Sequence, residues 1–184
     1  MVDLASLITP RFLLPYEINQ SEIEEICALK NQSWPHSMES QLDWWNKNTA
    51  VNDLLVTLVC EYSILAFLRL RSRIILVNGA HLEALCVTEV CVNQSQRKSG
   101  LGRQLMSVAT NCINQTSSSL GYLLCRDVHE QFYNSCGWHR VEAPLQIQSS
   151  IGREFRLLTE NERCMTFDTK RLLNGQIVLI GDVF

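Results

Sequence analysis

Two glycines and three basic residues follow an apolar run and have the composition of a phosphate-binding turn. The apolar run is Leu85–Val92, and after a polar stretch come Arg97, Lys98, Ser99, Gly100, Leu101, Gly102 and Arg103. Glycine lets a bulky anion approach the main chain closely, and arginine and lysine supply positive charge. The sequence therefore predicts that this turn binds a phosphate group.

The elements on either side of the turn are the ones that would position it. Leu85–Val92 is short, mostly apolar and rich in β-branched residues, which favours a buried strand. From Leu101 onward, apolar residues recur at helical spacing, which predicts a helix over residues 102–114. The N-terminus of such a helix presents unpaired N–H groups and the positive end of its dipole to the turn.

Two common phosphate-binding motifs do not match this turn. A P-loop would need Lys and Ser or Thr directly after the second glycine, but Gly102 is followed by Arg103 and Gln104. The dinucleotide-binding motif would need a third glycine where the chain has Leu105. The pattern that remains is Arg97-x-x-Gly100-x-Gly102 behind a strand.

A second pattern lies one helix and one strand further along the chain. It runs from Glu130 to Trp138 and contains Phe132-Tyr133 followed by Gly137-Trp138. In order and separation, the two patterns resemble motifs A and B of the GNAT N-acetyltransferase superfamily. The resemblance implies an α/β (α+β) fold, in which one GNAT-like domain over residues 1–184 has a central, mixed, mostly antiparallel sheet flanked by about four helices.

The resemblance also implies acetyl-CoA as the acyl donor and a primary amine of a small molecule as the acceptor. The amine would attack the thioester directly in a ternary complex. The pyrophosphate would bind at Arg97–Arg103, and the pantetheine arm would bind the main chain of Val90, Cys91 and Val92. An enzyme of this kind needs no metal, and none of the four histidines has metal-ligand spacing with another histidine or a cysteine.

Two residues are candidates for proton transfer. Tyr133 matches the superfamily tyrosine whose hydroxyl protonates the departing thiolate, and its alternative role is packing of the helix. Glu89 interrupts an apolar strand where superfamily members carry an acidic residue, so it could accept the proton of the amine. The alternative is that Glu89 lies on a solvated face or is paired to a basic residue, with Glu83 as the fallback base. A cysteine nucleophile at Cys91 is disfavoured, because no activating histidine is placed beside it.

The end of the chain, Leu179–Phe184, resembles that of the aminoglycoside 2′-N-acetyltransferases. The resemblance implies that Asp182 and Phe184 contact the acceptor, although Phe184 stands where that family has Trp. Arg126 and the position of Glu89, one place after Thr88, depart from that branch. We therefore expect distant kinship and a different acceptor, with an aminoglycoside 2′-N-acetyltransferase-like resistance enzyme as the alternative. An alternative of another class is a non-catalytic acyl-CoA-binding sensor or scaffold.

The amino-acid composition indicates which binding partners and which cellular location to expect. A net charge of −3 without a dense basic face argues against nucleic acid, and no apolar stretch is long enough to span a membrane. The eight cysteines form no Cys-x-x-Cys pair, which indicates reduced thiols and a cytoplasmic protein. An exposed C-terminal strand could pair with a second copy, so a homodimer is also an expectation.

Local patterns predict the remaining elements. Ser21 and Glu24 predict a capping box, and Asn78-Gly79 predicts a type I′ hairpin turn. Of the adjacent Trp44 and Trp45, one is expected to pack in the core. The expected helices cover residues 22–32, 38–48, 102–114 and 128–135; the expected strands cover residues 11–18, 55–60, 64–77, 81–92, 121–125, 138–145, 155–158, 164–167 and 176–180.

Overall fold

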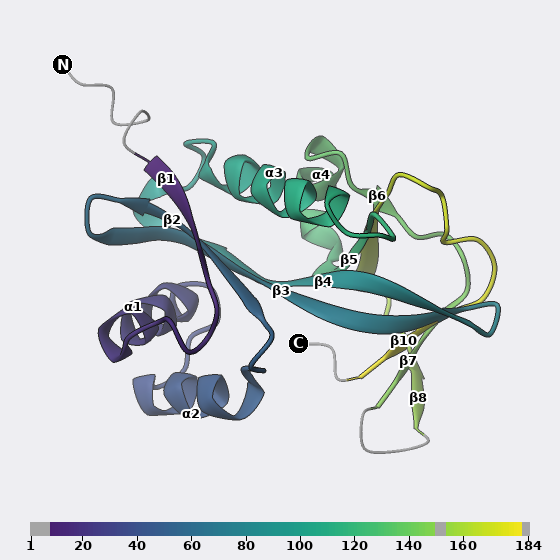
Figure 1. Ribbon diagram of the computed structural model, residues 1–184, viewed down its shortest axis with the longest axis horizontal. Coiled ribbons are helices and arrows are strands. Elements are labelled where there is room, and N and C mark those ends of the chain that lie inside the picture. The colour runs from purple at the N-terminus through teal and green to yellow at the C-terminus, as the bar shows by residue number, and fades with distance from the viewer. Residues whose placement is uncertain (1–7, 150–153, 182–184) are drawn as a thin grey trace. The chain divides into compact units, whose positions relative to one another are not determined.

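The computed structural model describes residues 8–149 and 154–181, which fall into two compact units (Figure 1). Within the described residues, the first unit comprises residues 8–71 and 89–109, and the second comprises residues 72–88, 110–149 and 154–181. The two longest strands, β3 (Ser63–Val77) and β4 (Ala80–Val92), contribute residues to both units.

The first unit contains an antiparallel sheet region between helices. Its other elements are β1 (Ile8–Leu13), α1 (Gln20–Asn31), α2 (Met38–Asn48), β2 (Leu54–Cys60), the short η2 (Gln94–Gln96) and the beginning of α3 (Leu101–Asn114). β1 pairs with β2, and β2 pairs with β3. Figure 1 shows α1 and α2 on one side of β2 and β3, with α3 on the other. One core cluster accordingly joins Ile26 of α1, Trp45 of α2, Leu55 of β2 and Phe67 of β3.

The second unit carries the later strands. These are β5 (Leu120–Arg126), β6 (His139–Arg140), β7 (Leu145–Gln148), β8 (Phe155–Leu157), β9 (Glu162–Asp168) and β10 (Ile177–Ile180), with η3 (Asp127–His129) and α4 (Glu130–Ser135) between β5 and β6. The hydrogen-bonded order is β6-β9-β5-β4 on one side and β3-β10-β7-β8 on the other. β4 pairs with β5 in parallel and β10 pairs with β7 in parallel, while the other described pairs of this unit are antiparallel.

The predicted fold class is confirmed: the described residues form a mixed, mostly antiparallel sheet with four α-helices. The single-domain organisation stays a prediction. Two strand predictions were wrong. The first strand begins at Ile8 and ends before Pro15. Within the predicted strand 138–145, only His139–Arg140 in β6 and Leu145 at the start of β7 pair in the sheet. The idea of an exposed C-terminal strand was also wrong for β10, because that strand lies between β3 and β7.

The turn between β3 and β4 has the predicted conformation. Asn78 and Gly79 both have positive φ angles, of 51° and 82°, as a type I′ turn requires. The Asn78 side chain donates to the Asn174 carbonyl at 2.8 Å and accepts from the Gln176 N–H at 3.0 Å. The turn is thereby tied to the segment that leads into β10.

The capping box of α1 lies two residues earlier than predicted. The N-cap is Asn19, whose side chain accepts from the Glu22 N–H at 3.0 Å, and Glu22 in turn accepts from the Asn19 N–H at 3.2 Å. Arg11 of β1 donates to Glu22 at 2.7 Å. This contact from a neighbouring strand favours the Asn19 box over the Ser21 box.

Replacing Asn19 by Ala is expected to lower the free energy of unfolding by about 1 kcal/mol, because the Glu22 N–H loses the side-chain oxygen that caps it. Chemical denaturation monitored by circular dichroism measures the change. Ser21→Ala is the matched control, with an expected change within about 0.5 kcal/mol. A larger loss in Ser21→Ala than in Asn19→Ala would contradict the assignment.

Candidate functional site

The turn predicted to bind phosphate lies in the first unit, between β4 and α3. After Val92, the Asn93 N–H donates to the Leu65 carbonyl of β3 at 2.8 Å. The Asn93 side chain then accepts from the N–H and the hydroxyl of Ser95 at 3.0 and 2.8 Å, which shapes η2. The Ser99 hydroxyl donates to the Gln96 carbonyl at 2.6 Å. These local bonds hold the turn in place before α3 begins.

The backbone of the turn leaves room for an anion at the start of the helix. Gly100 has φ of 96°, and a Cβ atom added there would meet no atom within 4 Å. Lys98 also has a positive φ, of 66°. The first turn of α3 carries no acidic residue that would repel an anion. The space, the helix dipole and the N–H groups of this helix end together fit a phosphate group.

The side chains of the turn divide into exposed and buried ones. Arg97, Lys98, Ser99, Gly100 and Arg103 are exposed, Gly102 is half-buried, and Leu101 is buried at 4% exposure. The Arg97 guanidinium donates to the Ser33 hydroxyl after α1 at 3.1 Å. Leu101 is therefore a core residue, and only its main chain could contact a ligand. The structure brings the rest of the predicted set together around one turn.

The end of β4 breaks the alternation of a regular strand at Glu89. Val87 and Thr88 are both buried, and Glu89 has a left-handed backbone with φ of 57°. Val90 and Val92 are half-buried, and Cys91 is 3% exposed. Burial raises the pKa of the Cys91 thiol far above its ordinary range, so this thiol is a poor nucleophile.

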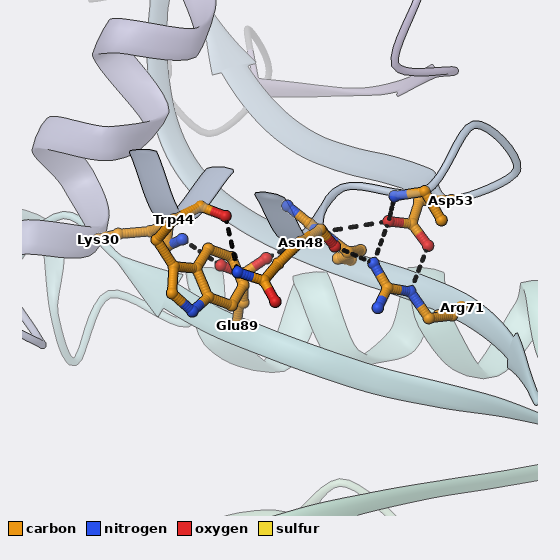
Figure 2. A network of polar contacts seen from close by, with 8 residues as sticks. Lys30, Trp44, Asn48, Asp53, Arg71 and Glu89 are labelled. Carbon is orange, nitrogen blue, oxygen red and sulfur yellow. Dashed lines mark hydrogen bonds and ion pairs between the residues drawn. The ribbon is translucent and has the colours of Figure 1, made fainter. Parts of the chain in front are cut away.

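Glu89 belongs to a buried ionic cluster, which we define as Lys30, Asp53, Arg69, Arg71 and Glu89 (Figure 2). The Glu89 residue as a whole is half-buried, but its side chain is only 6% exposed. Its carboxylate contacts the Lys30 ammonium from α1 and lies 2.9 Å from Nε of Arg69. These contacts are close ion pairs without the angles of hydrogen bonds. The structure thus places Glu89 in a pairing with basic residues, one of the alternatives that the sequence left open.

The other half of the cluster surrounds Asp53. Both nitrogens Nε and Nη2 of Arg71 lie 2.6 Å from the Asp53 carboxylate, and Nη1 of Arg69 lies 3.3 Å from it. Both arginines also donate to the Asn48 carbonyl at the end of α2. Burial lowers the pKa of Arg69, whereas Glu89 and Asp53 oppose this effect. The two carboxylates therefore favour the charged form of the Arg69 guanidinium.

The adjacent tryptophans of α2 both contact this cluster. The Lys30 ammonium lies 3.9 Å from the ring centroid of Trp44, and the Arg69 guanidinium carbon lies 4.9 Å from that of Trp45. Trp45 is the one that packs in the core, at 3% exposure, while Trp44 is half-buried above Lys30. Sequence reasoning missed the cluster, although Lys30 among the apolar residues of α1 and the alternating Arg69 and Arg71 in an apolar strand were its signals.

Tyr133 lies in α4 of the second unit and is 8% exposed. Burial raises the pKa of its hydroxyl above the ordinary value for tyrosine, and the Cys125 and Cys136 thiols add to the shift. The neighbouring Phe132 ring is packed edge-on against it at a centroid distance of 5.0 Å. α4 ends at a turn in which Gly137 has φ of 84°, so this conformation suits glycine.

The other site predictions concern the end of the chain, metals and membranes. Asp182 and Phe184 lie outside the described residues. Within residues 8–149 and 154–181, no group of three or more His, Cys, Asp or Glu side chains is placed to hold a metal ion. In the same part of the chain, no helix is long and apolar enough to cross a membrane.

A comparison with protein families matches residues 16–141 to the acetyltransferase (GNAT) domain. None of the curated proteins matches the sequence. Among solved structures, ElaA from Escherichia coli has a TM-score of 0.61 at 17% identity, over 88% of this chain and 99% of its own. The N-acetyltransferase YhbS from Escherichia coli, solved with CoA, has a TM-score of 0.64 at 14% identity, over 94% and 89%. An aminoglycoside 6′-N-acetyltransferase complexed with coenzyme A has a TM-score of 0.59 at 12% identity, over 86% and 96%.

Proposed function

The chain belongs to the GNAT acetyltransferase family, and on this premise we propose that it transfers the acetyl group of acetyl-CoA to a primary amine of a small molecule. The observation that supports the proposal most is the turn before α3. There, exposed basic residues surround Gly100, and the space beside its Cα is open at a helix N-terminus without acidic residues. Such a turn suits the pyrophosphate of a CoA thioester.

In this proposal, Arg97, Lys98 and Arg103 neutralise the pyrophosphate, and main-chain groups at Ser99–Gly102 contact it. The main chain of Val90–Val92 holds the pantetheine arm. Acetyl-CoA supplies the activated acetyl group, so the chain has only to orient the acceptor and to move protons. The buried, weakly acidic Cys91 thiol is a further reason to propose direct attack by the amine instead of an acyl-enzyme.

The proton-transfer roles fall to two residues. An alkyl ammonium has a pKa of about 10, so a base must take its proton before or during attack. We assign this role to Glu89, whose carboxylate oxygens make ion pairs but no directed hydrogen bonds among the described residues. We assign protonation of the departing sulfur to the Tyr133 hydroxyl. Asp182 and Phe184 remain the proposed acceptor contacts.

Acetyl-CoA and free CoA are expected to raise the melting temperature, whereas ATP and NAD should not. A ligand at ~100 times its dissociation constant adds about 2.7 kcal/mol to the free energy of unfolding. Gly100→Ala should lower CoA affinity at least about tenfold, because an alanine at this φ is strained and its methyl group occupies the open space. Gly79→Ala is the matched control: Gly79 also has positive φ and open surroundings but lies in the β3–β4 turn.

An amine-dependent release of CoA, followed with a thiol reagent across a panel of diamines, amino acids and aminoglycosides, tests the transfer itself. Turnover of an aminoglycoside would favour the resistance-enzyme alternative. Stabilisation by CoA without turnover of any amine would favour the sensor or scaffold. The absence of any response to CoA species would overturn the proposed function.

A further inference from the structure

The side chain of Glu89 is 6% exposed, and that of its partner Lys30 is 5% exposed. We propose that Lys30 is a positioning residue, whose ammonium keeps the Glu89 side chain a charged, correctly oriented carboxylate that can accept the proton of the acceptor amine. This inference rests on the proposed function. It assigns a role to a helix residue that has no part in the binding turn.

The energetic reason is the cost of a buried charge. Removing a carboxylate from water favours its neutral, protonated form, and a contacting cation favours the ionised form. A carboxyl group that is already protonated cannot accept a second proton from an ammonium ion. Glu89 must therefore be a carboxylate when the acceptor arrives. It then takes one proton from the acceptor nitrogen and passes it to solvent before the next turnover.

Lys30 is better placed than Arg69 to supply this effect. Arg69 is shared, because it also pairs with Asp53 at 3.3 Å and donates to the Asn48 carbonyl at 3.0 Å. The Lys30 ammonium has Glu89 as its one acidic partner in the part of the chain that the structure describes. A change at Lys30 thus alters the charge beside Glu89 without breaking the contacts around Asp53.

Other ionisable groups face the pair from α1 and β3, and an aromatic ring faces it from α2. From α1, the Cys27 thiol also faces Glu89, and burial raises its pKa, so it is uncharged at neutral pH. From β3, Arg69 faces Glu89, with Asp53 and Arg71 behind it. From α2, Trp44 brings an aromatic face 3.9 Å from the Lys30 ammonium. The ring holds the ammonium by a cation–π contact.

The test compares Lys30→Met, which removes the charge, with Lys30→Arg, which keeps it. The acid limb of the kcat/KM profile in Lys30→Met is expected to move to higher pH, because the variant loses one of the two cations in contact with the Glu89 carboxylate. In Lys30→Arg the limb should stay close to that of the native protein. Lys47→Met is the control for losing an exposed lysine, since Lys47 pairs with Asp43 on the surface of α2.

A second measurement keeps the inference separate from the proposed function. The Glu89 side-chain carboxyl, labelled with ¹³C and identified by its absence in Glu89→Gln, is titrated by NMR in the native protein and the variants. The pH at the midpoint of this titration should be higher in Lys30→Met than in the native protein. In Lys30→Arg it should stay close to the native value. If Lys30→Met does not fold, Lys30→Gln is used in its place. A rise in melting temperature on adding CoA shows that each variant is folded. Equal midpoints in the native and charge-removed proteins would overturn the role of Lys30, whatever the outcome of the transfer assay.

Discussion

Replacing Tyr133 by Phe is expected to lower kcat by about 10²- to 10⁴-fold, the usual contribution of a positioned general acid. The change deletes one hydroxyl from a side chain that is 8% exposed and leaves the ring to pack as before. Affinity for CoA, measured by thermal shift, should stay the same. The comparison therefore separates a role in chemistry from a role in binding.

The electrostatics of α4 are compatible with this role. Burial raises the pKa of Tyr133, so its hydroxyl stays protonated over the neutral and mildly alkaline range and remains a donor. A raised pKa also makes the phenol a weaker acid, but the same desolvation acts on sulfur. Burial raises the pKa of the nearby Cys125 thiol to about 11. A thiolate released in such surroundings would be more basic than in water, which offsets part of the rise in the pKa of the phenol.

Tyr122→Phe is the matched control, because it removes a phenol hydroxyl from another buried tyrosine of the second unit. The Tyr122 hydroxyl interacts with Cys86 in the sheet, so its loss should affect stability more than turnover. An unchanged kcat in Tyr133→Phe would remove the general acid from the proposal. A sensor or scaffold would show no turnover in either the native protein or the variants.

Replacing Asp53 by Ala is expected to lower the free energy of unfolding by about 3–5 kcal/mol, because Arg69 and Arg71 lose the carboxylate that they share. Asp53 is fully buried, and Arg69 and Arg71 are 1% and 8% exposed, so water cannot replace the lost partner. For a chain of this size, the melting temperature should fall by roughly 6–20 °C. Differential scanning calorimetry measures both quantities.

Asp43→Ala removes a carboxylate of the same type from an exposed ion pair with Lys47 on α2. Its expected cost is about 0.3–0.5 kcal/mol, as for other surface pairs one helical turn apart. The difference between the two aspartates isolates the effect of burial. Equal melting temperatures for the two variants would show that the buried cluster contributes no net stability.

Most of the fold could be predicted because its signals are local. The helix over residues 38–48, the turn at Asn78-Gly79 and the turn into α3 each depend on neighbours in the sequence. The capping box of α1 could not be settled this way, because Asn19–Glu22 and Ser21–Glu24 both fit the pattern. The hydrogen bond from Arg11 of β1 to Glu22 favours the Asn19–Glu22 box.

Pairing with strands that are distant in the sequence also explains why the strand over residues 138–145 was predicted too long. Residues 138–145 are apolar enough for one strand, but Pro144 has no N–H to donate. Its carbonyl instead accepts from the Ile177 N–H at 2.9 Å, and the chain from Leu145 onward pairs with β10. The predicted strand therefore divides into two short ones with different partners.

The difference between local and long-range contacts also decides which parts of the site could be predicted. The basic turn is contiguous in sequence, so its residue types and spacing were enough to predict its place in the fold. The buried ionic cluster is assembled from α1, the segment after α2, β3 and β4. Each charged residue could be recognised as unusual in an apolar element, but their pairing depends on how those elements pack.

The position of β10 between β3 and β7 bears on the order in which the chain can fold during synthesis. β3 and β7 are both translated before Ile177–Ile180, and β10 pairs with both of them in the sheet. Until β10 is made, those partners carry unpaired backbone groups and the apolar residues that it will cover. The second unit can thus complete its sheet only after its last described strand has been translated.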